Sequence, residues 1–205
     1  MKHPKEVSNM KIVEIFDSFQ GEGLFTGVPA TFLRLAGCNL NCDFCDTDFN
    51  YYKEISVELT REAILNHMKN HNNDLLVITG GEPLLQTDEI NELIKDLHCA
   101  IQIETNGIML RDIDPDITYV VSPKIKVKEI FDRLHKYPNV FFKFLIKNKY
   151  DLDMVEYLQE IYDYDKYIWL QPEFSRDKEI TKEILNSRMG NIMISGQLHK
   201  YLGVD

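Results

Sequence analysis

The sequence predicts an α/β fold made of parallel strand–helix units. Short, near-continuous apolar runs alternate with longer stretches whose apolar residues recur with a helical period, as buried parallel strands and their covering helices do. A second observation is that the most unusual residue clusters come directly after apolar runs. The carboxyl ends of the strands form the active-site face of a parallel barrel, so we expect these clusters to meet there.

The apolar runs place the strands, and the periodic stretches between them place the helices. Strands are expected at residues 11–16, 30–36, 75–79, 100–104, 118–122, 140–146, 167–171 and 191–195. Helices are expected at residues 60–70, 86–97, 127–137, 152–162 and 178–188. Thr60 is a good N-cap for the first helix, because Ala63, Ile64 and His67 then follow with a 3.6-residue period.

The length and composition are those of one catalytic domain. A chain of 205 residues can bury a substantial core but is short for two domains, and 44% hydrophobic and 27% charged residues are ordinary for a globular protein. The net charge of −10 argues against a broad basic surface for nucleic acid. We therefore expect a single domain over residues 1–205, with residues 1–10 as a flexible extension and no nucleic-acid partner.

No apolar run is long enough to cross a membrane, and the polar segment from Met1 to Met10 does not resemble a signal peptide. We expect a cytoplasmic protein with no membrane partner. In that compartment cysteines stay reduced and are available as metal ligands.

Three cysteines, Cys38, Cys42 and Cys45, follow the strand predicted at residues 30–36 with the spacing C-x-x-x-C-x-x-C. Three thiolates leave one iron of a cubic iron–sulfur cluster open, whereas electron carriers normally use four cysteines. A structural zinc site is the alternative, but such sites usually pair two knuckles and no second knuckle is visible. Cys99 is expected to be a buried core cysteine, with a distant fourth cluster ligand as the alternative.

Glycine- and proline-containing segments follow several other predicted strands. They are Gly80-Gly81-Glu82-Pro83, Thr105-Asn106-Gly107, Pro123-Lys124 and Pro172-Glu173. Each segment alone would be an ordinary turn, and Pro83 would simply open a helix. Glycines also let the backbone approach a ligand closely, and a carboxylate such as that of Glu82 suits an ammonium group.

The cysteine loop, with Phe44 just before its last cysteine, resembles that of the radical S-adenosylmethionine (SAM) superfamily. The segment from Thr79 to Pro83 is similar to the Gly-Gly-Glu-Pro segment that lies against the SAM amino group in that superfamily. The resemblance implies a modified partial (β/α) TIM-like barrel. It also implies a [4Fe–4S] cluster on Cys38, Cys42 and Cys45, whose open iron binds SAM.

A narrower resemblance begins at the amino terminus. Residues 15–23 and 32–40 resemble the 7-carboxy-7-deazaguanine synthase family, and the match extends to the carboxyl terminus through short segments such as Ser122-Pro123-Lys124 and Gln197-Leu198-His199-Lys200. The resemblance implies a radical SAM lyase that converts 6-carboxy-5,6,7,8-tetrahydropterin into 7-carboxy-7-deazaguanine, with loss of ammonia, for queuosine and other 7-deazapurines. It also implies a homodimer, reduced by an electron donor such as a flavodoxin or a ferredoxin.

The resemblance also assigns ligands to positions of this chain, while no side chain is assigned a catalytic role beyond the cluster and SAM. Substrate contacts fall on Phe19, Gln20, Gly21, Arg34, Thr79 and the terminal Asp205. SAM contacts fall on Phe44, Cys45, Asp46, Gly81, Ser122, Pro123, Lys124, Gln171, Pro172, Glu173 and Phe174, and Thr47 corresponds to a ligand of Mg²⁺. Without the family, residues 20–23 would be a hairpin turn and Arg34 a salt-bridged strand residue.

Two features of the assigned residues bear on these roles. A guanidinium grips a carboxylate at two points, so Arg34 suits an acidic substrate. The family often ends in a small apolar residue and proline, whereas this chain ends in Val204-Asp205. The substrate contact assigned to Asp205 therefore departs from the family pattern.

Two other functions remain open from the sequence. A glycyl-radical-enzyme activating enzyme shares the cysteine spacing but acts on a protein, and a non-catalytic iron–sulfur or zinc-binding module would need only the cysteines. Gln20-Gly21-Glu22-Gly23 and Arg34 favour a small acidic substrate over a protein. The segments at successive strand ends favour an enzyme over a module.

Overall fold

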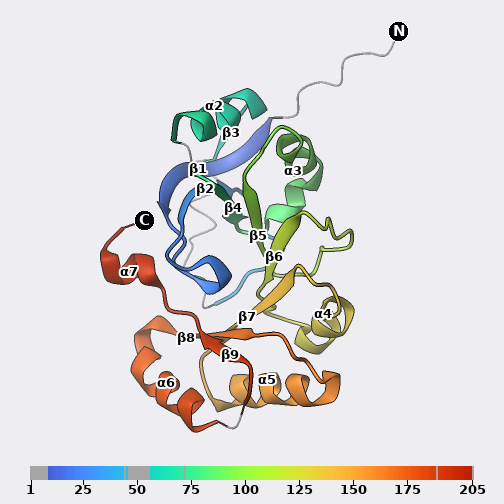
Figure 1. Cartoon of the computed structure of the whole chain (residues 1–205), viewed down its shortest axis with the longest axis vertical. Coiled ribbons are helices and arrows are strands. Elements are labelled where there is room, and N and C mark those ends of the chain that lie inside the picture. The colour runs from blue at the N-terminus through green and yellow to red at the C-terminus, as the bar shows by residue number, and fades with distance from the viewer. Residues whose placement is uncertain (1–8, 44, 46–55, 72, 188, 205) are drawn as a thin grey trace. The chain divides into compact units, whose positions relative to one another are not determined.

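Strands and helices alternate along the chain in a computed structural model that describes residues 9–43, 45, 56–71, 73–187 and 189–204 (Figure 1). Two compact units divide the chain. The first unit contains the residues up to Ser18 and Pro29–Glu104, and the second contains Phe19–Val28 and the residues from Thr105 onward. The expectation of a single domain over the whole chain stays a prediction.

The sheet of the first unit has the strand order β3-β1-β2-β4-β5. Its strands are β1 (Met10–Phe19), β2 (Pro29–Leu35), β3 (Val57–Leu59), β4 (Leu75–Gly80) and β5 (Ala100–Thr105). The strands β2, β4 and β5 run parallel, whereas β3 pairs antiparallel with β1. The residues from Leu75 to Ile78 are at most 2% exposed, which fits a parallel strand covered on both faces.

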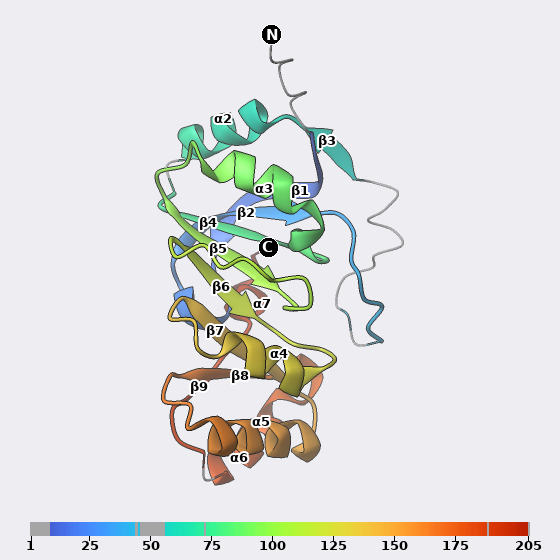
Figure 2. The same cartoon turned by 90° about the vertical axis from the view of Figure 1, so that its right-hand side faces the viewer.

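The helices of this unit are α2 (Arg61–His71), the short 3₁₀ helix η2 (Pro83–Gln86) and α3 (Thr87–Ile94). Figure 2 shows α2 and α3 on one side of the strands. Buried Ile64 and Met68 in α2 and Ile90 and Leu93 in α3 attach them to the core. The predicted cap of the first helix is confirmed, since Thr60 Oγ1 accepts from Ala63 N at 3.3 Å.

The second unit contains the parallel strands β6 (Ile117–Val121), β7 (Val140–Ile146), β8 (Ile168–Pro172) and β9 (Ile192–Ile194), in that order. Its helices are α4 (Val127–Leu134), α5 (Lys149–Tyr162), α6 (Asp177–Asn186) and α7 (Leu198–Leu202), with 3₁₀ turns η1 (Gly23–Phe25) and η3 (Phe174–Arg176). Helix α5 packs against β7, α6 against β8, and α4 beside α5 (Figure 1).

Aromatic rings hold α4 against the second sheet. Phe131 of α4 is fully buried, and its ring lies 4.4 Å from that of Phe142 and 5.1 Å from that of Tyr164, measured between centroids. Such pairs contribute about 0.5–1.5 kcal/mol beyond the contribution of the area they bury.

Met10 is the last residue of the predicted amino-terminal extension. It is the first residue of β1 and is only 1% exposed.

The predicted strands are present with ends shifted by at most one residue, except that the strand expected at residues 11–16 extends three residues further, to Phe19, and the predicted helices are present with some changes of length. The helix expected at residues 86–97 ends at Ile94, and the one expected at 127–137 ends at Leu134. Neither β3 nor α7 was predicted. Among the residues that the structure describes, no helix is both long and apolar enough to cross a membrane.

Candidate active site

The cysteine loop and the Gly-Gly-Glu-Pro segment leave the first sheet side by side. Strands β2 and β4 are parallel neighbours with Leu35 opposite Gly80, so both loops emerge at the same edge. Past the strands, Gly81 N donates to Leu35 O at 3.4 Å and Glu82 N donates to Gly37 O at 2.9 Å. The predicted meeting of these two motifs is therefore present within the first unit.

Gly80 is required by this arrangement. Its φ of +135° disfavours any residue with a side chain, and a Cβ there would lie 2.1 Å from Leu35 O. The two loops are thus brought together by the close approach of backbone to backbone.

The cysteine loop is shaped by its own hydrogen bonds. Leu40 N donates to Cys38 Sγ at 3.4 Å, and Cys45 N donates to Cys42 O at 3.1 Å. Burial raises the pKa of the Cys38 thiol, and negative charge on Glu82, Cys42 and Cys45 raises it further. Bound metal has the opposite effect, because it favours the thiolate.

Cys99 lies outside this loop, directly before β5. It is half-buried, and burial raises the pKa of its thiol, with Asp74 and the backbone of Leu76 as its neighbours. Cys99 is thus less buried than the core cysteine that the sequence predicted. The predicted cofactor residues Phe44, Asp46 and Thr47 lie outside the described residues.

Polar side chains form a row on one face of β2, β4 and β5. Arg34 and Thr79 are directly opposed in the parallel register. Thr79 Oγ1 donates to Glu104 Oε2 at 3.0 Å, and Gln102 Nε2 donates to Glu104 Oε1 at 3.1 Å. Gln102 is fully buried, and no described residue bonds to its Oε1. The row therefore presents a cation, a carboxylate and an unused acceptor from adjacent strands.

Arg34 carries an ion pair of its own. Its Nε lies 2.7 Å from Glu14 Oε1, and its guanidinium carbon lies 5.7 Å from the centroid of the Phe16 ring. The pairing uses one edge of the guanidinium, so the two terminal nitrogens remain for a further two-point contact. Both the salt-bridged strand residue and the carboxylate-binding residue expected from the sequence are compatible with this geometry.

In the second unit, Gln20 and Gly21 are fixed by contacts with their surroundings. Gln20 is 2% exposed, and its Oε1 accepts from Glu22 N at 3.0 Å. Gly21 O accepts from Leu198 N at 3.0 Å, and a Cβ on Gly21 would lie 2.1 Å from His199 Nδ1. Phe19 is 43% exposed. These hydrogen bonds hold residues 20–22 against the start of α7. A freely flexible turn would not have such bonds.

The carboxylate of Glu22, whose side chain is 16% exposed, binds several polar side chains of this unit. It forms an ion pair with Lys143 Nζ and accepts from Gln171 Nε2 at 3.2 Å and from Gln197 Nε2 at 2.8 Å. Burial by itself raises the pKa of the Glu22 carboxyl, but the Lys143 ammonium and the hydrogen bonds outweigh it and lower the pKa to about 2. The carboxylate stays charged and fixes Gln171, a predicted SAM contact.

The remaining predicted SAM segments of the second unit follow β6 and β8. Lys124 Nζ donates to Ser122 Oγ at 2.7 Å, and Ser122 N donates to Thr105 O at 2.8 Å. Pro123 stands between them. After β8, which ends with Gln171 and Pro172, Glu173 N donates to Ile146 O at 2.9 Å and Phe174 opens η3. The predicted terminal contact, Asp205, lies outside the described residues.

Sequence reasoning gave no roles to several residues that the structure makes prominent. These are Glu22, Gln102, Glu104, Lys143, Gln197 and His199. Glu22, Gln197 and His199 belong to segments quoted above for the resemblance, yet their side chains were not singled out. A lysine in the apolar run of residues 140–146 was the available signal, since a charge in a buried strand needs a partner.

Comparison with known proteins agrees with this geometry. The model of the Radical SAM superfamily matches residues 33–147, which include the cysteine loop, the Gly-Gly-Glu-Pro segment and Ser122-Pro123-Lys124.

A protein of Hyperthermus butylicus named 7-carboxy-7-deazaguanine synthase is 34% identical to this chain over 93% of this chain and 88% of that protein. This chain belongs to the 7-carboxy-7-deazaguanine synthase family. A family member from Rickettsia prowazekii is 34% identical over 97% of this chain and 90% of that protein. One from Methanospirillum hungatei is 35% identical over 96% of this chain and 87% of that protein. The expected family is therefore confirmed.

A solved structure extends the comparison to the fold. The crystal structure of QueE from Escherichia coli superposes with a TM-score of 0.71 at 26% identity, covering 93% of this chain and 95% of that one. The expected fold class, an α/β modified partial barrel of the radical SAM type, is thereby confirmed.

Membership in the synthase family makes the chain an enzyme and implies a [4Fe–4S] cluster and SAM. The residues present fit these groups. Three reduced cysteines share one loop, a backbone N–H already points at the sulfur of Cys38, and such hydrogen bonds are common around cluster sulfurs. Gly81 and the buried Glu82 lie directly beside the loop, where an amino group of SAM needs close approach and a carboxylate.

Proposed function

We propose that this chain is a 7-carboxy-7-deazaguanine synthase, which contracts the ring of 6-carboxy-5,6,7,8-tetrahydropterin to 7-carboxy-7-deazaguanine with loss of ammonia. The reaction would make it a carbon–nitrogen lyase in the pathway to queuosine and other 7-deazapurines. The single observation that carries the proposal is the adjoining cysteine loop and Gly-Gly-Glu-Pro segment, in a chain similar over nearly its whole length to proteins of that name.

Separate sets of residues are proposed to bind the cluster, SAM and Mg²⁺. Cys38, Cys42 and Cys45 hold the cluster, and the SAM contacts are those assigned from the family, including Gly81 and Lys124. Bound together, the reduced cluster and SAM supply the carbon radical that starts the rearrangement. Thr47 is the proposed protein ligand of Mg²⁺, which takes few ligands from protein and prefers oxygen.

Arg34 is proposed to bind the carboxylate of the substrate. Its terminal nitrogens can make a two-point contact while Nε stays with Glu14, and the neighbouring Thr79 and Glu104 offer a hydroxyl and a carboxylate for the N–H groups of a pterin. The Oε1 atom of Gln102 is buried and no described residue bonds to it, which supports a ligand with N–H donors here. Phe19, Gln20, Gly21 and Asp205 keep the substrate roles that the family assigns.

Two partners belong to the same proposal. The cluster must receive an electron, for which a flavodoxin or a ferredoxin is the proposed donor. A homodimer is proposed by analogy with the family, and sedimentation equilibrium of the purified chain tests it directly.

The activity is tested by anaerobic reconstitution with iron and sulfide, followed by SAM, Mg²⁺, a reductant and the carboxypterin, with mass spectrometry of the product. We expect the deazaguanine acid from the wild-type chain. Cys42→Ala is expected to lose both bound iron and product, whereas Cys99→Ser, the matched control outside the loop, retains both.

Two results would contradict the proposal in different ways. An intact, reducible cluster with no deazaguanine acid would reject the substrate and leave a glycyl-radical-enzyme activating enzyme as the better interpretation. Full activity in Cys42→Ala would reject the three-cysteine cluster itself.

A further inference from the structure

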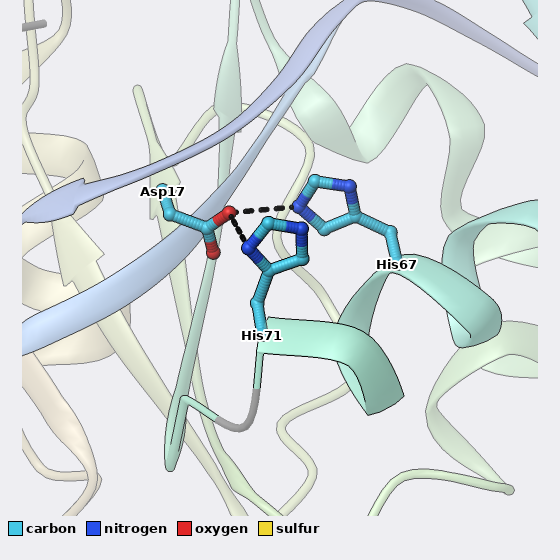
Figure 3. A group of neighbouring side chains, drawn as sticks. All are labelled: Asp17, His67 and His71. Atoms are coloured by element: carbon cyan, nitrogen blue, oxygen red, sulfur yellow. Dashed lines mark hydrogen bonds and ion pairs between the residues drawn. The ribbon is translucent and has the colours of Figure 1, made fainter.

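A second group of metal-binding side chains lies on the first unit, formed by Asp17 of β1 and His67 and His71 of α2. Asp17 Oδ2 lies 3.0 Å from His67 Nε2 and 2.8 Å from His71 Nδ1. Figure 3 shows both imidazole rings pointing from one face of α2 toward the Asp17 carboxylate. None of the three residues has a role in the proposed reaction.

The spacing of the two histidines suits a shared metal ion. Residues four apart lie on the same face of a helix, and the two rings stack with centroids 4.2 Å apart at an angle of 11°. One ligand atom from each of the three residues lies within 4.8 Å of the others. Ligands bonded at about 2.0–2.1 Å to tetrahedral zinc are about 3.3 Å apart, so small side-chain movements would complete the site.

The carboxylate is already oriented for this role. Its other oxygen, Asp17 Oδ1, accepts from Thr31 Oγ1 at 2.6 Å and from Asn73 Nδ2 at 2.6 Å, and Asn73 also donates to Thr31 at 3.1 Å. Thr31 is fully buried, so this support is fixed by the core. Hydrogen bonds that hold the far side of a ligating carboxylate are a regular part of metal sites.

We propose that Asp17, His67 and His71 bind a zinc ion that joins α2 to β1. Two imidazoles and one carboxylate are a ligand set of zinc sites that leave the fourth position to water, and hard ions such as Mg²⁺ prefer oxygen ligands. The side chains are 23%, 47% and 26% exposed for His67, His71 and Asp17, so water reaches the fourth position.

The chemistry of binding requires no redox partner. In the metal-free protein each ring can donate an N–H to Asp17 Oδ2. For zinc to bind, each neutral imidazole adopts the tautomer whose lone pair faces the metal, and the carboxylate oxygen gives up the two N–H bonds. The cluster cysteines are not part of this group of ligands.

The test uses the reconstituted holoenzyme, in which the cluster occupies the cysteines, titrated with zinc chloride and analysed by calorimetry and zinc-edge X-ray absorption. We expect one zinc per chain with nitrogen and oxygen neighbours at about 2.0–2.1 Å and no sulfur at about 2.3 Å. His71→Gln and Asp17→Asn are expected to weaken binding at least about 100-fold, and Asn73→Ala about 10-fold, as loss of a supporting bond does.

His98→Ala is the matched control, since His98 is part of the same unit outside the group, and it should bind zinc as the wild type does. Circular dichroism confirms that each variant is folded, and at equal zinc concentration zinc should raise the melting temperature of the wild type and of His98→Ala more than that of His71→Gln or Asp17→Asn. The proposal is overturned if the bound zinc has sulfur neighbours or if the holoenzyme binds no zinc. It is also overturned if the folded variants His71→Gln and Asp17→Asn both bind zinc as tightly as the wild type.

Discussion

At the scale of single residues, the Glu22–Lys143 pair has the largest consequence for stability. Lys143→Met leaves a largely buried carboxylate without its cation, and breaking a buried ion pair costs up to about 3–5 kcal/mol. We expect a lower free energy of unfolding in urea. In the double variant Glu22→Gln/Lys143→Met part of that loss returns, because no unpaired charge remains. Additive losses in this cycle would show that the pair does not interact.

The same pair makes the free energy of unfolding depend on pH in the acid range. The pKa of Glu22 is about 2 in the folded protein and 4.5 as its ordinary value, so the folded state holds the proton less tightly. The stabilisation is fully present above pH 4.5 and is lost as the pH falls from 4.5 toward 2. Glu22→Gln should therefore show a flatter decline of unfolding free energy over that window. Identical slopes in the two proteins would contradict the assigned pKa.

Arg34 gives the residue-scale test of substrate binding. Arg34→Met removes the proposed contact with the substrate carboxylate, and a hydrogen bond to a charged group contributes about 1.5–3 kcal/mol, so kcat/KM should fall about 10- to 100-fold. Stability should change little, because its partner Glu14 is 46% exposed. Lys95→Met, which removes an exposed ion pair beside α3, serves as the control. A purely structural Arg34 would alter the melting temperature and leave kcat/KM unchanged.

At the scale of elements, the register of β2 against β4 depends on Gly80. Gly80→Ala places a Cβ 2.1 Å from Leu35 O in a backbone conformation with φ of +135°, so we expect a loss of at least about 2 kcal/mol in unfolding free energy and weaker cluster retention. Gly190→Ala is the matched control, because nothing lies within 4 Å of its Cβ position. Equal stability of the two variants would remove the proposed steric role.

The elements that the sequence failed to predict are short. Strand β3 has three residues, Val57–Leu59, two of them exposed, and gains its order from pairing with β1. Helix α7 buries none of its residues, so no apolar period marks it. In contrast, α5 begins at Lys149 because Asn148 and Asp151 form a capping box, a signal that hydrophobic periodicity does not contain. Long apolar periods are readable from sequence, whereas short elements depend on their neighbours.

The candidate site was predictable to the extent that it consists of contiguous motifs. The cysteine spacing is local, so the metal-binding roles of Cys38, Cys42 and Cys45 could be predicted from the order of residues, whereas the roles of Gly81 and Arg34 were predicted only from the resemblance to the family. Buried polar partners such as Lys143 and Gln197 come from distant segments, and only the fold shows that both bond to Glu22. The loops predicted to bind cofactors are thus visible in the sequence, whereas the polar network around Glu22 required tertiary structure.

At the scale of the whole molecule, we expect the chain to unfold in one step. Two strands are shared by the two units, because the last residue of β1, Phe19, and the last residue of β5, Thr105, belong to the second unit. Unfolding either unit therefore releases one end of a strand that the other requires. Fluorescence of Trp169, the single tryptophan and part of β8, should report the same urea midpoint as far-ultraviolet circular dichroism. Separate midpoints would indicate units that unfold independently.

The contact between Gly80 and Leu35 also bears on how freely the enzyme can be changed. The spacing of the two cofactor loops is set by main-chain atoms, namely a glycine and a carbonyl oxygen, and makes no demand on the identity of the neighbouring side chains. Mutations that reshape the polar row around Arg34 can therefore accumulate without displacing the loops. Laboratory evolution toward other acidic heterocycles should start from that row and keep Gly80 invariant.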